Sequence, residues 1–225
     1  MEVRFLGHAG FELADGGDTT VLIDPFLTGN PKAAIGAEDA AATTILLTHG
    51  HGDHVGDTVG IAKRTGAPVV AIVEIANELG EEGVDVRDPN MGGTVKFDWG
   101  WVKLVPAWHT STTPKGPVNT PAGLLISFAD TVVYHLGDTC LFSDLQLVGK
   151  RHPIDIALMC IGGHYTMDRV DAVDAAELVG AKTVIPCHYN TFPPIETDAQ
   201  AFKSDVESAT RSNVVVLEPG QSHST

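Results

Sequence analysis

One short segment of the chain, Thr48–His54, carries four side chains of the kinds that bind metals within six residues, with glycines between them. These side chains are His49, His51, Asp53 and His54. Packing of a hydrophobic core does not explain such an array, whereas imidazole nitrogen and carboxylate oxygen are ligands that divalent metals prefer. The segment predicts a site in which His49 and His51 turn to one metal and Asp53 and His54 turn to a second. The alternative, a polar turn that caps the next helix, leaves the repeated ligand types unexplained.

Histidine and aspartate also recur where short apolar, β-branched runs end. Ten runs of about strand length are bounded by Gly, Pro, Asp or Asn, which is typical of strands. The residues at or just past the ends of such runs are His8, Asp24, His49, His109, Asp138 and His188. Each histidine taken alone would be interpreted as a core or surface residue. Together they predict a site along one sheet edge, because ligand groups gather at the carboxyl ends of strands.

Helical patterns lie between these runs and complete the expected fold. They cover Val55–Thr65, with Gly66 as its stop, and Asp171–Val179 and Asp198–Arg211. Ala129-Asp130 predicts a hairpin turn between two antiparallel strands. Strands of both orientations with helices between them predict mixed sheets that are covered by helices on the outside.

Two segments, Phe26–Thr43 and Thr110–Ala122, have no periodic pattern. The second begins immediately after His109 and is rich in proline and glycine. Long loops that begin at a candidate ligand are often functional, so we expect this loop to face the substrate.

Composition limits the partners of the chain. Its 225 residues are 43% hydrophobic and 19% charged, which is typical of a globular domain, and its formal net charge is −15. Such a surface repels phosphate backbones and anionic lipid, which disfavours nucleic acid and membranes as partners. Three cysteines without C-x-x-C spacing favour free thiols in a reducing cytoplasm. We therefore expect a cytoplasmic protein with a small-molecule substrate, and the sequence is compatible with a homo-oligomer.

The pattern H-x-H-x-D-H, followed by a distant His, an Asp and a final His, resembles the metallo-β-lactamase superfamily over essentially the whole chain. The resemblance implies an α+β fold, a four-layer αββα sandwich, with residues 1–225 as a single domain. Motifs such as Pro186–Pro193 narrow the resemblance to one group of bacterial and archaeal proteins. These proteins are described as metal-dependent hydrolases and are similar to ascorbate-6-phosphate lactonase. Where similar proteins tend to carry Asn or Asp, this chain has His164.

The resemblance also implies roles for individual residues. It makes His49, His51 and His109 ligands of the first metal, and Asp53, His54 and His188 ligands of the second. Asp138 matches the carboxylate that bridges the two metals. Asp53 or Asp138 is further expected to accept and relay a proton, in addition to its role as a ligand. Four residues are expected to contact the ligands or to face the substrate: His8, Asp24, His164 and Asn190. Two alternatives stay open here, a buried structural role for His8 and the capping of a turn by Asp24.

Two divalent cations held ~3.5–4 Å apart stabilise a bridging hydroxide near neutral pH. The expected function is therefore hydrolysis of an ester, lactone or phosphoester bond of a small substrate. Zinc is the default metal for these ligands, and manganese, iron or nickel suits the same nitrogen and oxygen set. Two alternatives remain open: a non-catalytic metal-binding protein, and a phosphodiesterase that acts on nucleotides or nucleic acid.

Overall fold

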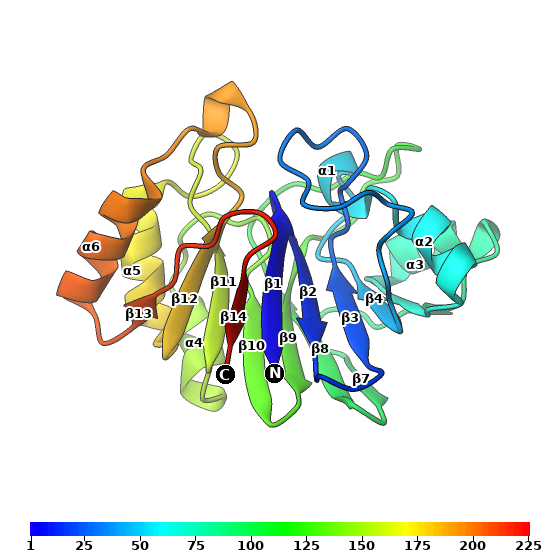
Figure 1. The fold of residues 1–225 in the computed structure, drawn as a ribbon, viewed down its shortest axis with the longest axis horizontal. Coiled ribbons are helices and arrows are strands. Elements are labelled where there is room, and N and C mark those ends of the chain that lie inside the picture. The colour runs from blue at the N-terminus through cyan, green and yellow to red at the C-terminus, as the bar shows by residue number, and fades with distance from the viewer.

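The computed structural model describes residues 1–225 and contains two seven-stranded sheets that face each other (Figure 1). The first sheet consists, in spatial order, of β14 (Ser222–Ser224), β1 (Glu2–Gly7), β2 (Gly10–Ala14), β3 (Thr20–Ile23), β4 (Thr44–Leu46), β5 (Val69–Val70) and β6 (Val86–Arg87). The second consists of β13 (Asn213–Val214), β12 (Thr183–Cys187), β11 (Ile156–Cys160), β10 (Thr131–His135), β9 (Ala122–Phe128), β8 (Gly100–Pro106) and β7 (Thr94–Phe97).

Each sheet is antiparallel in one half and parallel in the other. The neighbours from β14 to β3 pair antiparallel and those from β3 to β6 pair parallel. In the second sheet, β7 to β10 pair antiparallel and β10 to β13 pair parallel. Ala129 and Asp130 join β9 to β10 with positive φ angles of 46° and 59°, as the predicted hairpin turn requires. The mixed sheets predicted from the sequence are confirmed.

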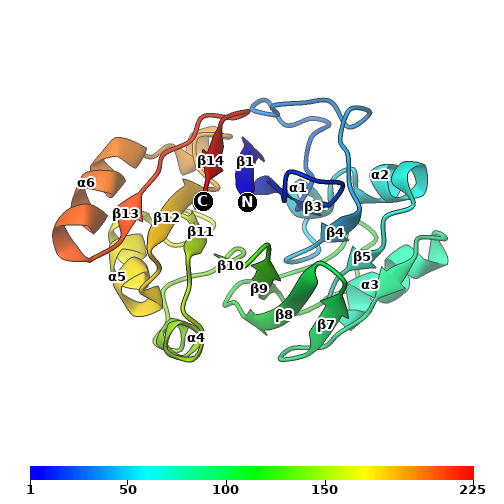
Figure 2. The ribbon, with the colours of Figure 1, turned by 60° about the horizontal axis from the view of Figure 1, so that its bottom comes forward.

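Helices cover the outer faces of both sheets, which completes the predicted αββα order (Figure 2). The helices beside the first sheet are α1 (Gly52–Val55), α2 (Thr58–Thr65) and α3 (Val73–Glu81). Those beside the second are α4 (Leu145–Arg151), α5 (Arg169–Val179) and α6 (Ala199–Ala209), with a 3₁₀ turn, η1, at Pro193–Ile195. No helix of the chain has the length and apolar content that a membrane crossing requires.

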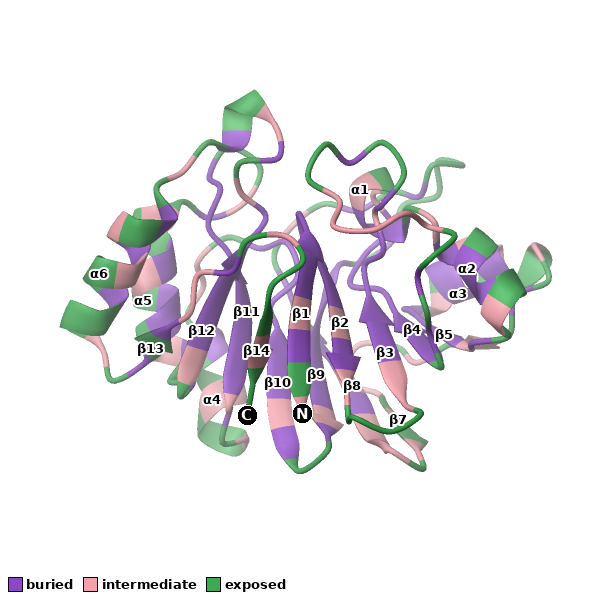
Figure 3. Cartoon of the chain, viewed as in Figure 1, coloured by how far each residue is buried: buried purple, intermediate pink, exposed green.

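Buried residues make up most of the strands (Figure 3), and their side chains form two hydrophobic cores. On β11, Ile156 and Leu158 belong to the core that fills the space between the sheets, and Ala157 and Met159 belong to the core under α4, α5 and α6. All five residues of β11 are buried, as expected for a parallel strand that is covered on both faces. The rigid layers hold the strand ends, and therefore the loops after them, in fixed positions.

Local signals explain where the helices begin and end. The carboxylate of Asp168 accepts hydrogen bonds from two backbone amides of α5, and Asp198 does the same for α6. Gly66 ends α2 in the left-handed conformation, as predicted. The expectation of one continuous helix over Val55–Thr65 was wrong. Gly56, at φ 41°, separates α1 from α2, and a Cβ there would lie 2.4 Å from the carbonyl oxygen of Pro25.

Candidate metal centre

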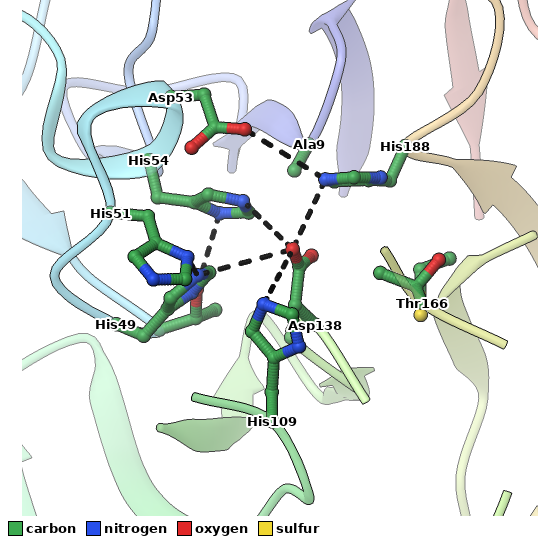
Figure 4. Close-up of polar contacts among 12 residues, drawn as sticks. Ala9, His49, His51, Asp53, His54, His109, Asp138, Thr166 and His188 are labelled. Atoms are coloured by element: carbon green, nitrogen blue, oxygen red, sulfur yellow. Dashed lines mark hydrogen bonds and ion pairs between the residues drawn. The ribbon is translucent and has the colours of Figure 1, made fainter. Parts of the chain in front are cut away.

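All seven predicted ligands converge at the edge where the strands end (Figure 4). The loop after β4 and the short helix α1 supply the four ligands of the Thr48–His54 segment. His109 follows β8, Asp138 follows β10 and His188 follows β12. The cluster therefore joins four segments that are far apart in the sequence, at the position that the sequence predicts.

The ligand atoms form two neighbouring groups, which a third set, His49, His54 and Asp138, connects within the same 4.8 Å limit. His49, His51 and His109 form the first group, in which the ligand atoms lie within 4.8 Å of one another. The second group obeys the same limit and consists of Asp53, His54 and His188 together with His8. The division matches the two ligand sets implied by the resemblance, with His8 as an additional member.

Asp138 lies between the two groups. Its Oδ2 atom is 3.9 Å from Nε2 of His49 and 3.7 Å from Nε2 of His109. The same oxygen is 3.4 Å from Nε2 of His54 and 3.1 Å from Nε2 of His188. One buried carboxylate oxygen thus faces two histidines from each group, which is the position required of a bridging ligand.

Several buried polar atoms at this point have no hydrogen-bond partner. They are Nε2 of His54, both ring nitrogens of His188 and Oδ1 of Asp138. Buried groups of this kind are costly unless something compensates for their desolvation, and a cation would do so for a carboxylate and for imidazole lone pairs. The donor set therefore fits divalent metal ions.

The pKa values of the cluster residues also fit the binding of divalent metal ions. Burial holds the pKa values of His49, His51 and His109 below the usual histidine range, which keeps the lone pairs of these imidazoles available. Burial acts against the charged form of Asp138 as well. The nearby His188 and His54 outweigh this effect and hold the pKa of Asp138 well below its ordinary value. Burial by itself would lower the pKa of His54, but the carboxylates of Asp138 and Asp24 outweigh this effect and hold that pKa well above its ordinary value. The three histidines His49, His51 and His109 thus present neutral imidazoles beside an anionic carboxylate.

Comparison with known proteins identifies the family. Residues 2–188 match the family model described as a Beta-lactamase superfamily domain. The chain is 45% identical over 227 residues to a UPF0173 metal-dependent hydrolase of Pelotomaculum thermopropionicum, with 99% of each chain covered. It is 48% identical over 203 residues to a UPF0173 metal-dependent hydrolase of Thermus thermophilus, with 90% of this chain and 89% of that protein covered. The chain belongs to the UPF0173 metal-dependent hydrolase family.

Solved structures agree with this assignment. Igni18, a metallo hydrolase from the archaeon Ignicoccus hospitalis, has a TM-score of 0.90 and 38% sequence identity, covering 99% of this chain and 97% of its own. The metallo-β-lactamase fold protein YhfI of Bacillus subtilis, at 14% identity and a TM-score of 0.73, shares the fold, with 99% of both chains covered. The predicted membership of the metallo-β-lactamase superfamily and the predicted sandwich are confirmed.

In this UPF0173 protein, Asp24 orients two of the cluster histidines. Its Oδ2 atom lies 2.7 Å from Nδ1 of His54 and accepts a hydrogen bond of 2.6 Å from the hydroxyl of Thr48. Because that hydroxyl donates its proton to Asp24, Nδ1 of His49, 3.0 Å away, donates to the hydroxyl oxygen. Both imidazoles therefore carry a proton on Nδ1 and turn Nε2 toward the centre. A carboxylate that fixes the tautomer in this way raises the basicity of a ligating histidine.

His8 supports Asp53 from the other side. Its Nε2 lies 3.1 Å from Oδ2 of Asp53 and its Nδ1 lies 2.9 Å from the hydroxyl of Thr191. Burial lowers the pKa of His8 to about 4. Burial by itself would raise the pKa of Asp53, but the hydrogen bond with His8 and the charge of His54 hold it below its ordinary value. His8 is therefore buried and contacts Asp53, a predicted ligand.

The other two residues of that predicted set lie outside the cluster. His164 is exposed and packs against Tyr165, with ring centroids 4.5 Å apart. The side chain of Asn190 is also exposed, and its Oδ1 accepts a hydrogen bond of 2.7 Å from the backbone of Thr197. The contact of Asn190 stabilises its own loop.

Backbone strain concentrates around the site. Seven residues other than glycine have positive φ angles, and two of them form the turn between β9 and β10. The other five are His8, Asp24, His164, His188 and Asn190. Such conformations cost free energy and persist where the surrounding structure enforces them, often at functional sites.

Two hydroxyl residues of the site had no role in the sequence-based prediction. Thr48 connects Asp24 to His49, and Thr191 contacts His8. The only sequence signal was position, because Thr48 directly precedes His49 and Thr191 follows His188 by three residues. Threonine is too common at strand ends for that signal to have been decisive.

Proposed function

We propose that this metal-dependent hydrolase cleaves an ester, lactone or phosphoester bond of a small substrate at a centre of two divalent ions. The observation that carries the proposal is the position of Asp138, whose Oδ2 lies within 4 Å of Nε2 of two histidines from each group. A site for a single structural metal needs no carboxylate shared between two complete ligand groups.

Each of the two ions would have its own set of protein ligands, with one ligand shared. His49, His51 and His109 would hold one ion, Asp53, His54 and His188 the other, and Asp138 both. Bound divalent ions at such a centre supply Lewis acidity and lower the pKa of the water that is to act as the nucleophile. Zinc is the metal we expect, since imidazole and carboxylate are its usual ligands.

The two predicted catalytic carboxylates differ in their access to solvent. The side chain of Asp53 is 33% exposed and that of Asp138 is 4% exposed. Asp53 is therefore the group positioned to pass a proton from the attacking water to solvent, and its contact with His8 holds it in orientation for this. Asp138 remains a ligand.

The net charge of −15 favours this reading over a phosphodiesterase that acts on nucleic acid. A small substrate approaches within the local field of the metal ions, whereas a polynucleotide also meets the acidic surface around the site.

A metal titration combined with an activity panel tests the proposal. The protein is stripped with a chelator and reloaded stepwise with zinc, manganese, iron or nickel while its hydrolysis of lactones, esters and phosphodiesters is measured. We expect activity to appear as the second ion per chain binds. Full activity with one ion per chain contradicts the two-metal centre. Two bound ions with no hydrolysis of any bond class would support the non-catalytic alternative.

A further inference from the structure

A groove of about 700 Å³ begins at His109, a member of the first ligand group. Its walls are the segment after β8 and the loop of residues 110–121 that follows His109. The apolar side chains along it include Trp108, Val118, Pro106 and Pro121. Its volume lies within the range of ligand sites, ~300–1,000 Å³. The groove borders the candidate metal centre at His109, which takes part in both.

The groove holds apolar surface that faces solvent. Five large hydrophobic side chains of the protein are exposed, and Trp108, at 65%, and Val118, at 78%, both line this groove. Grouped apolar exposure of this kind marks binding surfaces more often than single exposed residues do.

The backbone that carries Trp108 is fixed. Its amide donates a hydrogen bond of 3.0 Å to the hydroxyl of Thr139, and its carbonyl oxygen accepts one of 3.1 Å from the amide of Cys140. Thr139 and Cys140 directly follow Asp138. The backbone from which the indole projects is thus held at a set position relative to Asp138, while the side chain of Trp108 stays accessible to a ligand.

The charges along the groove disfavour anionic ligands. No lysine or arginine lines it, and apart from His109 its only titratable side chain is Asp144. A phosphate or carboxylate on the substrate would find no cation there and would meet a carboxylate. The groove therefore does not suit a phosphorylated sugar lactone, the substrate type of the ascorbate-6-phosphate lactonase that the sequence resembles.

We propose that this groove binds an uncharged alkyl or aryl part of the substrate, with Trp108 as its main contact surface. The proposal rests on the proposed hydrolytic function and specifies its substrate class: neutral esters or lactones that carry an apolar substituent. The scissile carbonyl would lie at the metal centre, and the substituent would extend along the loop of residues 110–121.

The test uses the metal-loaded protein and a series of methyl esters, acetate, butyrate and octanoate, whose hydrolysis is followed by acid release, with 6-phosphogluconolactone as the anionic comparison. For the wild type we expect kcat/KM to rise roughly two- to fourfold per added methylene and to be lowest for the anionic lactone. Trp108→Ala should lower kcat/KM for octanoate roughly tenfold and change that for acetate less than about twofold. Trp108→Phe should restore most of the loss. Val118→Ser provides a second, milder variant of the same groove.

Val170→Ala is the matched control, because Val170 is also 65% exposed but lies on α5, outside the groove. It should leave the whole series unchanged. An unaltered chain-length dependence in Trp108→Ala and Val118→Ser overturns the proposal. So does an equal loss for acetate and octanoate, since that would mean that Trp108 only positions His109.

A binding measurement separates this proposal from the hydrolytic function. Phenylbutanamide is uncharged, and its stable amide makes it a binding probe. Calorimetric binding to the wild type that Trp108→Ala removes would support the groove even if no ester is cleaved. If esters are cleaved but phenylbutanamide does not bind, the hydrolytic function stands and the groove proposal fails.

Discussion

The two ligand groups differ in how they are held. In the second group, His54 and His188 are buried, Asp24 contacts His54 directly, and His8 contacts Asp53. In the first group, His51 and His109 are partly exposed, and His49 reaches Asp24 only through the hydroxyl of Thr48. The first group also borders the groove at His109.

This difference suggests that the two groups have different roles, one in metal binding and one in substrate contact. Groups that orient a ligating side chain raise its affinity for the metal, and the second group has more of them. We therefore expect the second group to bind its ion more tightly and the first group to lie where the substrate arrives. Asp138 lies between the two groups, so changing it should affect both of them.

Asp138→Asn should have the largest effect. The substitution is nearly isosteric but removes a negative charge from between the two groups, so both should bind metal less tightly. Hydrolysis should fall by at least ~10²-fold, the range for loss of a key electrostatic group. Activity assays and metal analysis check this, with His223→Ala, on β14 and away from the cluster, as the control. Wild-type turnover with two ions bound would refute the bridging role.

Asp24→Asn should distinguish the two groups. The direct partner of Asp24 is His54, so affinity at the second group should fall ~10–100-fold, as for other residues that orient metal ligands. Affinity at the first group should fall less. Competition with a chelator resolves the two release steps, and Asp18→Asn, at an exposed aspartate, serves as the control. An equal loss at both steps would show that the two groups are not held differently.

His135 is buried and contacts the backbone next to His8 and next to Asp138, and its burial should make folding sensitive to acid. Its Nε2 lies 3.0 Å from the carbonyl oxygen of Ala9, and its Nδ1 accepts a hydrogen bond of 3.0 Å from the amide of Gly137. Burial lowers the pKa of His135. Below pH ~6.5 the unfolded chain takes up the proton first, so stability is present above that pH and is lost as the pH falls toward the folded-state pKa.

Urea unfolding at several pH values checks this, with chelator present so that metal release does not contribute. His135→Gln should be less stable than the wild type at pH 8 but should lose less stability on acidification. The difference between the slopes should be at most about 1.4 kcal/mol per pH unit, the limit for one proton. Parallel slopes would mean that His135 does not titrate with folding.

The sequence predicted those parts of this arrangement that depend on local pattern. Apolar runs that end in His or Asp placed the cluster at one sheet edge, and Asp198 and Gly66 marked helix boundaries that the structure has. Elements that depend on distant partners were missed. β14 is a polar segment that becomes a strand only because it pairs with β1, and α4 has a single buried side chain, Leu145.

The backbone conformations at the site and the shape of the groove were even harder to predict from the local sequence. Nothing in the identity of His8 or His188 indicates a positive φ angle, because the surrounding fold imposes it. Asn190 is different, since asparagine tolerates this conformation. The open groove also had little signal: the loop after His109 was expected to face the substrate, but its contribution of Val118 to an apolar wall depends on three-dimensional placement.

Asn119→Ala should have the smallest effect and should act on the first group alone. Asn119 is buried at the base of the loop of residues 110–121 and accepts a hydrogen bond from the hydroxyl of Ser111, whose oxygen accepts one of 2.8 Å from the amide of Gly50, between His49 and His51. Losing this contact costs about 0.5–1.5 kcal/mol and should loosen the loop beside the groove without removing a ligand. We expect KM to rise a few-fold, with both ions still bound and kcat nearly unchanged. Lys115→Ala, in the same loop, breaks only an exposed ion pair with Glu82 and should change neither constant. If Asn119→Ala instead releases an ion, the first group depends on its loop for metal binding, and the assignment of substrate contact to this side would have to be revised.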